Sequence, residues 1–158
     1  MPTRWRGSAG IWGCISYEGA GVCSLYDGRI TAEKYIEVLE DYLIPSLELL
    51  VPPGDPYLFQ QDNASPHTAK ITQEKFVEMG IPLLEWPAKS PDLNPIEHIW
   101  AWIDRQLARK TFDTIAELKD GLHEAWMKIP AELCAKLVLS MKRRVKMCIA
   151  ARGSYTKY

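Results

Sequence analysis

Two carboxylates in this sequence are placed where they could hold a divalent cation. Asp62 follows the apolar run Tyr57–Gln61, which predicts a short strand, and Glu97 stands in the first turn of a predicted helix. Metal-dependent phosphoryl transfer needs carboxylates that converge from different elements, because two Mg²⁺ ions ~3.5–4 Å apart must be neutralised. Ligand sites in open α/β sheets lie at the carboxyl ends of the strands, which is where Asp62 stands. Since the helix of Glu97 follows the next strand, Glu97 can point back at the same edge, and the pair predicts a magnesium site there.

Each carboxylate also has an ordinary structural explanation. Asp62 is followed by Asn63, and an Asp beside Asn, Ser and Pro is typical of a turn. Glu97 lies three residues after Asn94, which is the position of the glutamate in a helix capping box. Local context alone favours these structural roles, so the functional interpretation depends on the two residues taken together.

The elements that must position these residues follow from hydrophobic periodicity and turn signals. In chain order they are strands near 11–17 and 21–26, a helix capped by Thr31 that stops before Pro52, a strand at 57–61, a helix beginning at Ser65-Pro66 and ending at Gly80, a strand at 81–86, a helix beginning at Asn94-Pro95, and helices near 114–128 and 131–150. Pro45 is expected to kink the first helix. The second helix is expected to turn Ile71, Phe76 and Met79 inward, and the third Ile96, Ile99, Trp100, Ile103 and Leu107. This order predicts a mixed α/β domain with a helical C-terminal flank.

Length and composition bound the class of protein. With 158 residues and 47% hydrophobic content, the chain is expected to form one globular domain, 1–158. The formal net charge of −1 excludes a globally basic nucleic-acid binder, so any DNA contact must come from a local patch. The four cysteines have neither zinc-ligand spacing nor a disulfide pattern and are expected to be reduced thiols. No signal peptide or membrane span of ~18–20 apolar residues is evident, so we expect an intracellular protein, nuclear or cytoplasmic.

Two long blocks carry a family resemblance. Leu58–Ala69 (LFQQDNASPHTA) and Trp86–Trp100 (WPAKSPDLNPIEHIW) resemble the signature blocks around the second and third catalytic acids of mariner-like, Tc-type DDE transposases. The thirty-five positions from Asp62 to Glu97 match the spacing of the Tc-type branch. The resemblance extends from Trp12–Ser16 to the closing Ser154–Tyr158.

The resemblance implies an α/β fold of the ribonuclease-H-like type, a mixed sheet flanked by helices with extra helices at the C-terminal end. It implies that Asp62 is the second acid and Glu97 the third, both ligands of Mg²⁺ or Mn²⁺ in a two-ion site, with no organic cofactor. Asn63, His67 and Asn94 match the same blocks as supporting residues. Asn63 either orients Asp62, meets a phosphate or stabilises the turn, and His67 is a packing or capping residue or a catalytic one.

The sequence departs from the family at its first acid. In the family that acid lies on a strand preceding the hairpin, whereas the earliest acid here is Glu18. We therefore expect the first strand to be missing and its central slot in the sheet to be empty, which leaves two open strand edges. The helix-turn-helix DNA-binding region of the family is also not found, so the chain is expected to be an N-terminally truncated catalytic domain that retains little or no activity.

Basic residues near the C-terminus are the candidate contacts with DNA. Lys142, Arg143, Arg144 and Lys146 cluster on the last helix, and Lys89 lies in the loop before Glu97. A solvated helix face is the alternative explanation of the cluster. The expected partner is DNA, with homodimerisation through the open sheet edge as a second expectation. The resulting function is a metal-dependent DNA cleavage and strand-transfer domain by ancestry, and the alternative is a relic or domesticated module that binds nucleic acid or oligomerises without catalysis.

Overall fold

A two-part hairpin forms the centre of the computed structural model, which describes residues 8–85 and 93–151. Strand β1 (Ala9–Trp12) pairs antiparallel with β4 (Ser24–Asp27), and β2 (Ile15–Ser16) pairs antiparallel with β3 (Gly19–Ala20). Successive side chains of β1 alternate between the two faces of the hairpin, as in any strand. The observed pairing confirms the hairpin expected from the sequence. The hairpin separates the helices into two groups.

A bulge separates the two strand pairs. Trp12 is opposite Ser24, but the Gly21 N–H bonds the Cys14 carbonyl at 2.8 Å, so Gly13 faces two residues, Val22 and Cys23. The backbone groups freed by the bulge find partners on helices. Ser46 Oγ accepts from the Val22 N–H at 2.9 Å, and Trp126 Nε1 donates to the Gly21 carbonyl at 2.8 Å. The hairpin is thereby tied to helices on both of its faces.

One long helical segment follows the hairpin, made of α1 (Ala32–Val38), a π-helical turn η1 (Leu39–Leu43) and α2 (Ile44–Leu50). Thr31 caps it as expected, because its Oγ1 accepts from the Lys34 N–H at 3.2 Å. The π-helical turn η1 lies directly before Pro45, which occupies the first turn of α2. A proline ring collides with the carbonyl four residues earlier, and the wider π turn gives that carbonyl room.

The two predicted strands at 57–61 and 81–86 are reduced to one parallel bridge between Phe59 and Leu83. The Phe59 N–H bonds the Pro82 carbonyl at 2.8 Å, and the Leu84 N–H bonds the Phe59 carbonyl at 2.9 Å. The expectation of full strands was therefore wrong over the described residues. Pro82 has no N–H to extend the ladder, and no further strand lies beside Phe59 among the residues described.

Two short helices replace the single one expected after Asp62. They are α3 (Ser65–Thr68) and α4 (Lys70–Met79), separated by Ala69, whose ψ of 141° is not helical. The N-cap of α3 is Ala64 rather than Ser65. Gly80 ends α4 in the left-handed conformation (φ 67°), as predicted. The break also changes the buried face: Ile71 is 41% exposed, contrary to expectation, while Thr72 is buried.

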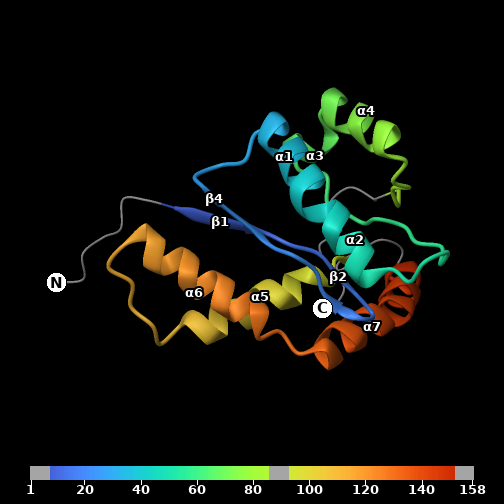
Figure 1. Cartoon of the computed structure of the whole chain (residues 1–158). Helices are drawn as coiled ribbons and strands as arrows, with labels where there is room; N and C mark the ends of the chain where they lie inside the picture. Colours follow the sequence, from blue (N-terminus) through green and yellow to red (C-terminus); the bar gives the residue numbers. More distant parts are fainter. Residues whose placement is uncertain (1–7, 86–92, 152–158) are drawn as a thin grey trace.

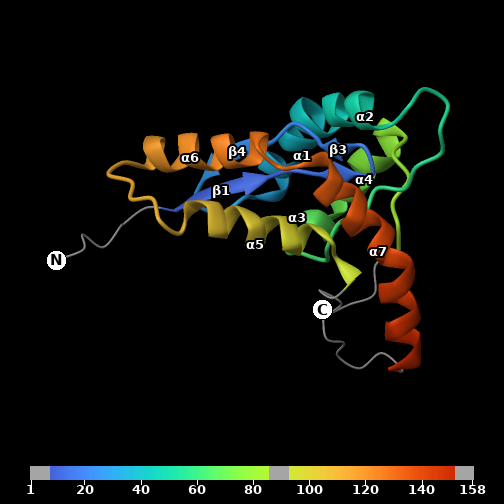
Figure 2. The same ribbon diagram turned by 90° about the horizontal axis from the view of Figure 1, so that it is seen from below.

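The C-terminal half is helical as predicted, with α5 (Ile96–Leu107), α6 (Ile115–Met127) and α7 (Ala131–Ala150). These helices lie on one side of the hairpin and the helices from α1 to α4 on the other (Figure 1). Each side has its own core. The first contains Ile99, Ile103, Ala125, Trp126, Cys134 and Leu137, and the second Tyr35, Leu39, Leu43, Phe76 and Ile81. Figure 2 shows the C-terminal part of α7 extending past the rest of the molecule.

No helix within 8–85 and 93–151 is long and apolar enough to cross a membrane.

Candidate active site

A groove of about 470 Å³ separates the hairpin from the segment that ends at Asp62. Residues 11–17 form one wall and residues 57–62 form the other. The start of α5, residues 94–97, closes one part of the groove, and α7 contributes Val138 and Met141. Most of this lining is apolar, and the carboxylates of Asp62 and Glu97 both belong to it.

Asp62 is held in a turn through one of its two carboxylate oxygens. Its Oδ1 accepts from the Ala64 N–H at 3.0 Å and lies 2.6 Å from His67 Nδ1. The turn role that local sequence suggested for Asp62 is therefore present. It engages Oδ1, while the side chain as a whole remains 50% exposed at the groove.

A hydrogen bond from the wall formed by residues 57–62 brings Glu97 to the same groove. Gln60 Nε2 donates to the Leu93 carbonyl at 3.0 Å, which fixes the turn before α5 beside the segment that leads to Asp62. The Asn94 carbonyl then accepts from the Glu97 N–H at 3.3 Å. The N-cap of α5 is Pro95, and it makes no side-chain cap bond. A capping box formed by Asn94 and Glu97 requires Asn94 as the N-cap, so the observed start of α5 does not match that structural alternative.

The negative charges of Asp62 and Glu97 repel each other, and this repulsion affects the pKa of Glu97. Burial raises the pKa of Glu97 above its ordinary value, and the negative charge of Asp62 raises it further. Because a divalent cation would relieve this repulsion, the pair is a suitable place for one. Carboxylate oxygens are the ligands of Mg²⁺, which commonly takes one or two of them and completes its shell with water and phosphate. Over the described residues, no three or more His, Cys, Asp or Glu side chains gather into a fuller metal site.

The supporting residues from the signature blocks lie around this pair. Asn94 lines the groove next to Glu97, and His67 lines it next to Asp62. Asn63 is exposed beside Asp62. Lys89, the candidate phosphate contact in the loop before α5, lies outside the described residues.

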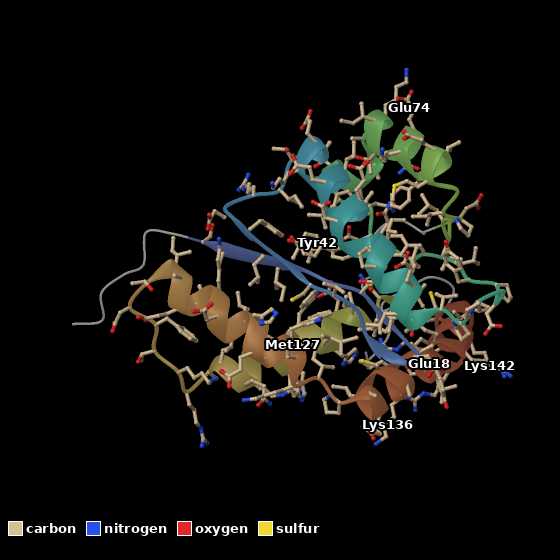
Figure 3. The ribbon with its side chains drawn as sticks, in the orientation of Figure 1. Glu18, Tyr42, Glu74, Met127, Lys136 and Lys142 are labelled. Carbon is tan, nitrogen blue, oxygen red and sulfur yellow. The ribbon has the colours of Figure 1, made fainter. Side chains whose placement is uncertain are left out.

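The basic cluster on α7 divides into exposed and buried members. Lys142, Arg143 and Lys146 are exposed, and Figure 3 shows the Lys142 side chain pointing away from the body. Arg144 is only 3% exposed, and its Nε donates to Ser140 Oγ at 2.7 Å. The expectation that Arg144 belongs to the same surface cluster is therefore corrected, since the helix turns this position inward.

Two residues near Asp62, Tyr35 and Gln61, were not singled out as site residues from the sequence. Tyr35, fully buried on α1, stacks on the His67 ring with centroids 4.2 Å apart, and its hydroxyl donates to Gln61 Oε1 at 2.7 Å. Burial raises the pKa of the Tyr35 hydroxyl, which stays protonated and able to donate. The available signal was a tyrosine at an inward helix position, because a buried hydroxyl needs a partner.

Comparison with known proteins places these features in a family. Residues 1–119 match the DDE superfamily endonucleases. The chain is 35% identical over 152 residues to the transposable element Tcb2 transposase of Caenorhabditis briggsae, covering 96% of this chain and 55% of that protein. It is 34% identical to the Tc1 transposase of Caenorhabditis elegans over the same shares of the two chains. The chain thus spans about half the length of these relatives.

Solved structures of the Mos1 transposase have the same fold. The Mos1 catalytic domain with Raltegravir and Mg superposes with a TM-score of 0.83 at 23% identity, covering 96% of this chain and 84% of that one. A Mos1 mariner paired end complex with Mn gives a TM-score of 0.87 at 25% identity, covering 99% of this chain and 47% of that one. The ribonuclease-H-like α/β fold expected from the sequence is confirmed at this level.

Proposed function

The chain belongs to the DDE superfamily endonucleases and is homologous to the Tc1/mariner transposases, and on this premise we propose that it carries two of the three carboxylates of a DNA cleavage and strand-transfer site. Asp62 takes the place of the second acid and Glu97 that of the third. One observation carries this proposal: both side chains line one groove. The charge of Asp62, which adds to the effect of burial in raising the pKa of Glu97, is consistent with it.

The proposed cofactor is Mg²⁺ or Mn²⁺, in line with the Mos1 structures that contain these ions. When bound, such an ion activates water and stabilises the leaving oxygen in phosphodiester cleavage. The contribution of this chain is to supply the two anionic ligands, Asp62 and Glu97, at a groove rim that is open to a large substrate. Gln60 holds the two ligand segments together through the Leu93 carbonyl.

We further propose that the groove is the place of the family's first strand, which carries the first acid. The Ser8–Gly28 bond places Ser8, Gly10 and Trp12 in the bonded positions toward β4. Because these positions alternate in antiparallel pairs, the backbone groups of Ala9 and Ile11 point to the other edge. On the opposite wall Phe59 bonds residues 82 and 84, so the backbone groups of Leu58 and Gln60 point away from that bridge.

Two strand edges therefore border one apolar groove, and among the described residues no strand occupies the space between them. A synthetic peptide with alternating apolar residues and one Asp should slow amide hydrogen exchange at Ile11 and Gln60. A second copy of the chain is the competing occupant, and it would appear as a dimer in sedimentation. Hydrogen exchange at Ile11 and Gln60 that is unchanged by the peptide would contradict the proposal that the groove takes the first strand.

We propose that this chain by itself is inactive, or nearly so, in DNA cleavage, because it holds two of the three carboxylate ligands. Purified chain incubated with supercoiled plasmid and Mg²⁺ or Mn²⁺ should nick it no faster than the Asp62→Ala variant. Mn²⁺ should nevertheless raise the unfolding midpoint of the wild-type chain and not that of Asp62→Ala, since a ligand stabilises only the state that binds it. Nicking that depends on Mg²⁺ and is lost in Asp62→Ala would refute the inactivity.

A second candidate function is nucleic-acid binding without catalysis, favoured by the exposed Lys142, Arg143 and Lys146 in the C-terminal half of α7. Neutralising phosphate contacts lowers DNA affinity and flattens its salt dependence by about one unit of slope per contact. The Lys142→Gln and Lys146→Gln variants should show both effects on a DNA duplex. Lys136→Gln, on the same helix and also exposed, is the matched control. Equal affinities for all variants would exclude this surface.

A further inference from the structure

Hydrogen bonds to Oδ1 set the orientation of the Asp62 carboxylate. In the described part of the chain, both bonds to this side chain go to Oδ1, from the Ala64 N–H at 3.0 Å and from His67 Nδ1 at 2.6 Å. An ionised carboxylate only accepts, so Nδ1 must carry the proton. Two donors on Oδ1 fix the rotation of the carboxylate and leave Oδ2 as the oxygen available to a cation in the groove.

The His67 ring is itself held by packing. Its side chain is 17% exposed and lies against the ring of the fully buried Tyr35, with centroids 4.2 Å apart and planes tilted by 35°. The hydroxyl of Tyr35 is tied down in turn, because it donates to Gln61 Oε1 at 2.7 Å. The face of the imidazole therefore rests on a buried side chain that cannot move without breaking this hydrogen bond.

The backbone of His67 is fixed from two further elements. Its carbonyl accepts from Gln73 Nε2 on α4 at 2.7 Å and from Gln61 Nε2 at 3.4 Å. Gln61 is thus bonded at both ends, to Tyr35 and to His67, immediately before Asp62. A histidine that served only to pack a helix turn would not need its ring nitrogen aimed at a carboxylate oxygen as well.

We propose that His67 is a positioning residue that holds Asp62 by Oδ1, so that Oδ2 is presented to the divalent cation, and that Tyr35 sets the place of the imidazole. This inference rests on the proposed function, in which Asp62 is a metal ligand. Partners that orient metal ligands typically change metal affinity by ~10–100-fold when they are removed. Tyr35 and Gln61 belong to the same arrangement although they contact no cation.

The first test needs no metal. Nitrogen NMR of the metal-free chain, which distinguishes the two tautomers of a neutral imidazole, should show His67 protonated at Nδ1. Removing its acceptor in Asp62→Ala should shift the proton toward Nε2, because the hydrogen bond of one ring nitrogen decides which one is protonated. A wild-type His67 that carries its proton on Nε2 would overturn the proposal.

The second test measures Mn²⁺ affinity by electron paramagnetic resonance on three matched variants. His67→Phe keeps a ring on Tyr35 but removes the donor, and it should bind Mn²⁺ at least ~10-fold more weakly. His67→Asn, whose amide can donate from nearly the position of Nδ1, should retain most of the affinity. His123→Phe, the same substitution at an exposed position of α6, should bind as the wild type does.

The outcomes separate this proposal from the proposed function. If Asp62→Ala binds Mn²⁺ as well as the wild type, the metal site itself is refuted. If Asp62→Ala loses binding while His67→Phe keeps it, the metal site stands and the positioning role is overturned. Should His67→Phe fail to fold, His67→Asn and the tautomer measurement decide: an Asn variant that binds as weakly as Asp62→Ala overturns the proposal.

Discussion

Replacing Gly13 by alanine should destabilise the fold by forcing a collision with Trp126. A Cβ at this position would lie 2.2, 2.5 and 2.7 Å from Cη2, Cζ2 and Cζ3 of that indole. The indole has little room to retreat, because it is 1% exposed and its Nε1 is bonded to the Gly21 carbonyl at 2.8 Å. Gly13 is not among the glycines with positive φ, so backbone strain adds nothing to the effect.

The expected magnitude follows from two opposing effects. Overpacking a well-filled core costs about 1–3 kcal/mol. Replacing glycine by alanine restricts the unfolded chain and returns about 0.4–1 kcal/mol. The net loss for Gly13→Ala is therefore roughly 1–2 kcal/mol. For a domain of this size, each kcal/mol lowers the unfolding midpoint by about 2–4 °C.

A double-mutant cycle with Trp126→Phe tests the cause. The three colliding atoms belong to the benzo ring of the indole, which phenylalanine lacks, so Gly13→Ala should cost much less in that background. Thermal unfolding followed by circular dichroism on the four proteins gives the coupling energy, expected between about 0.5 and 3 kcal/mol. Trp102→Phe, half-buried on α5, controls for the loss of an indole. An equal penalty for Gly13→Ala in both backgrounds would refute the reasoning.

Three further predictions concern single positions. Because its folded pKa is raised, Glu97 contributes stability that is fully present below its ordinary pKa and lost as pH rises through the raised value. Glu97→Gln should therefore have a higher unfolding midpoint than the wild type at pH 7, and this gain should vanish near pH ~3; a gain independent of pH would contradict it. Ser46→Ala removes the acceptor of the Val22 N–H and should cost roughly 1 kcal/mol in urea unfolding, whereas no loss would mean that water replaces the hydroxyl. Thr31→Ala should cost about 1 kcal/mol through loss of the α1 cap, with Thr31→Ser close to the wild type; equal midpoints for all three would show the cap to be unimportant.

Much of the fold could be predicted because its signals are local. The hairpin, the cap at Thr31 and the stop at Gly80 each depend on a few neighbouring residues. The helices α5, α6 and α7 follow from apolar spacing that agrees with their buried faces, such as Ile99 and Ile103. The two candidate acids stood out because their signature blocks are long and correctly spaced.

The rest depends on contacts between distant segments. Whether residues 57–61 form a full strand is decided by their neighbours in the sheet, and only one bridge is present. The bulge at Gly13 is fixed by Ser46 and Trp126, which are far away in sequence. The burial of Arg144 likewise reflects the packing around α7. The contact of Tyr35 with His67 joins α1 to α3, which is another part of the chain, and no local signal predicts it.

Aromatic side chains in the groove wall give the molecule an optical property of its own. The indoles of Trp12 and Trp100 both line the groove, and Trp100 stacks on Trp126 with centroids 5.7 Å apart. The emission of these rings depends on whether water or protein surrounds them. A strand that enters the groove would expel that water, so a shift of intrinsic fluorescence toward shorter wavelength would report occupancy without any attached dye.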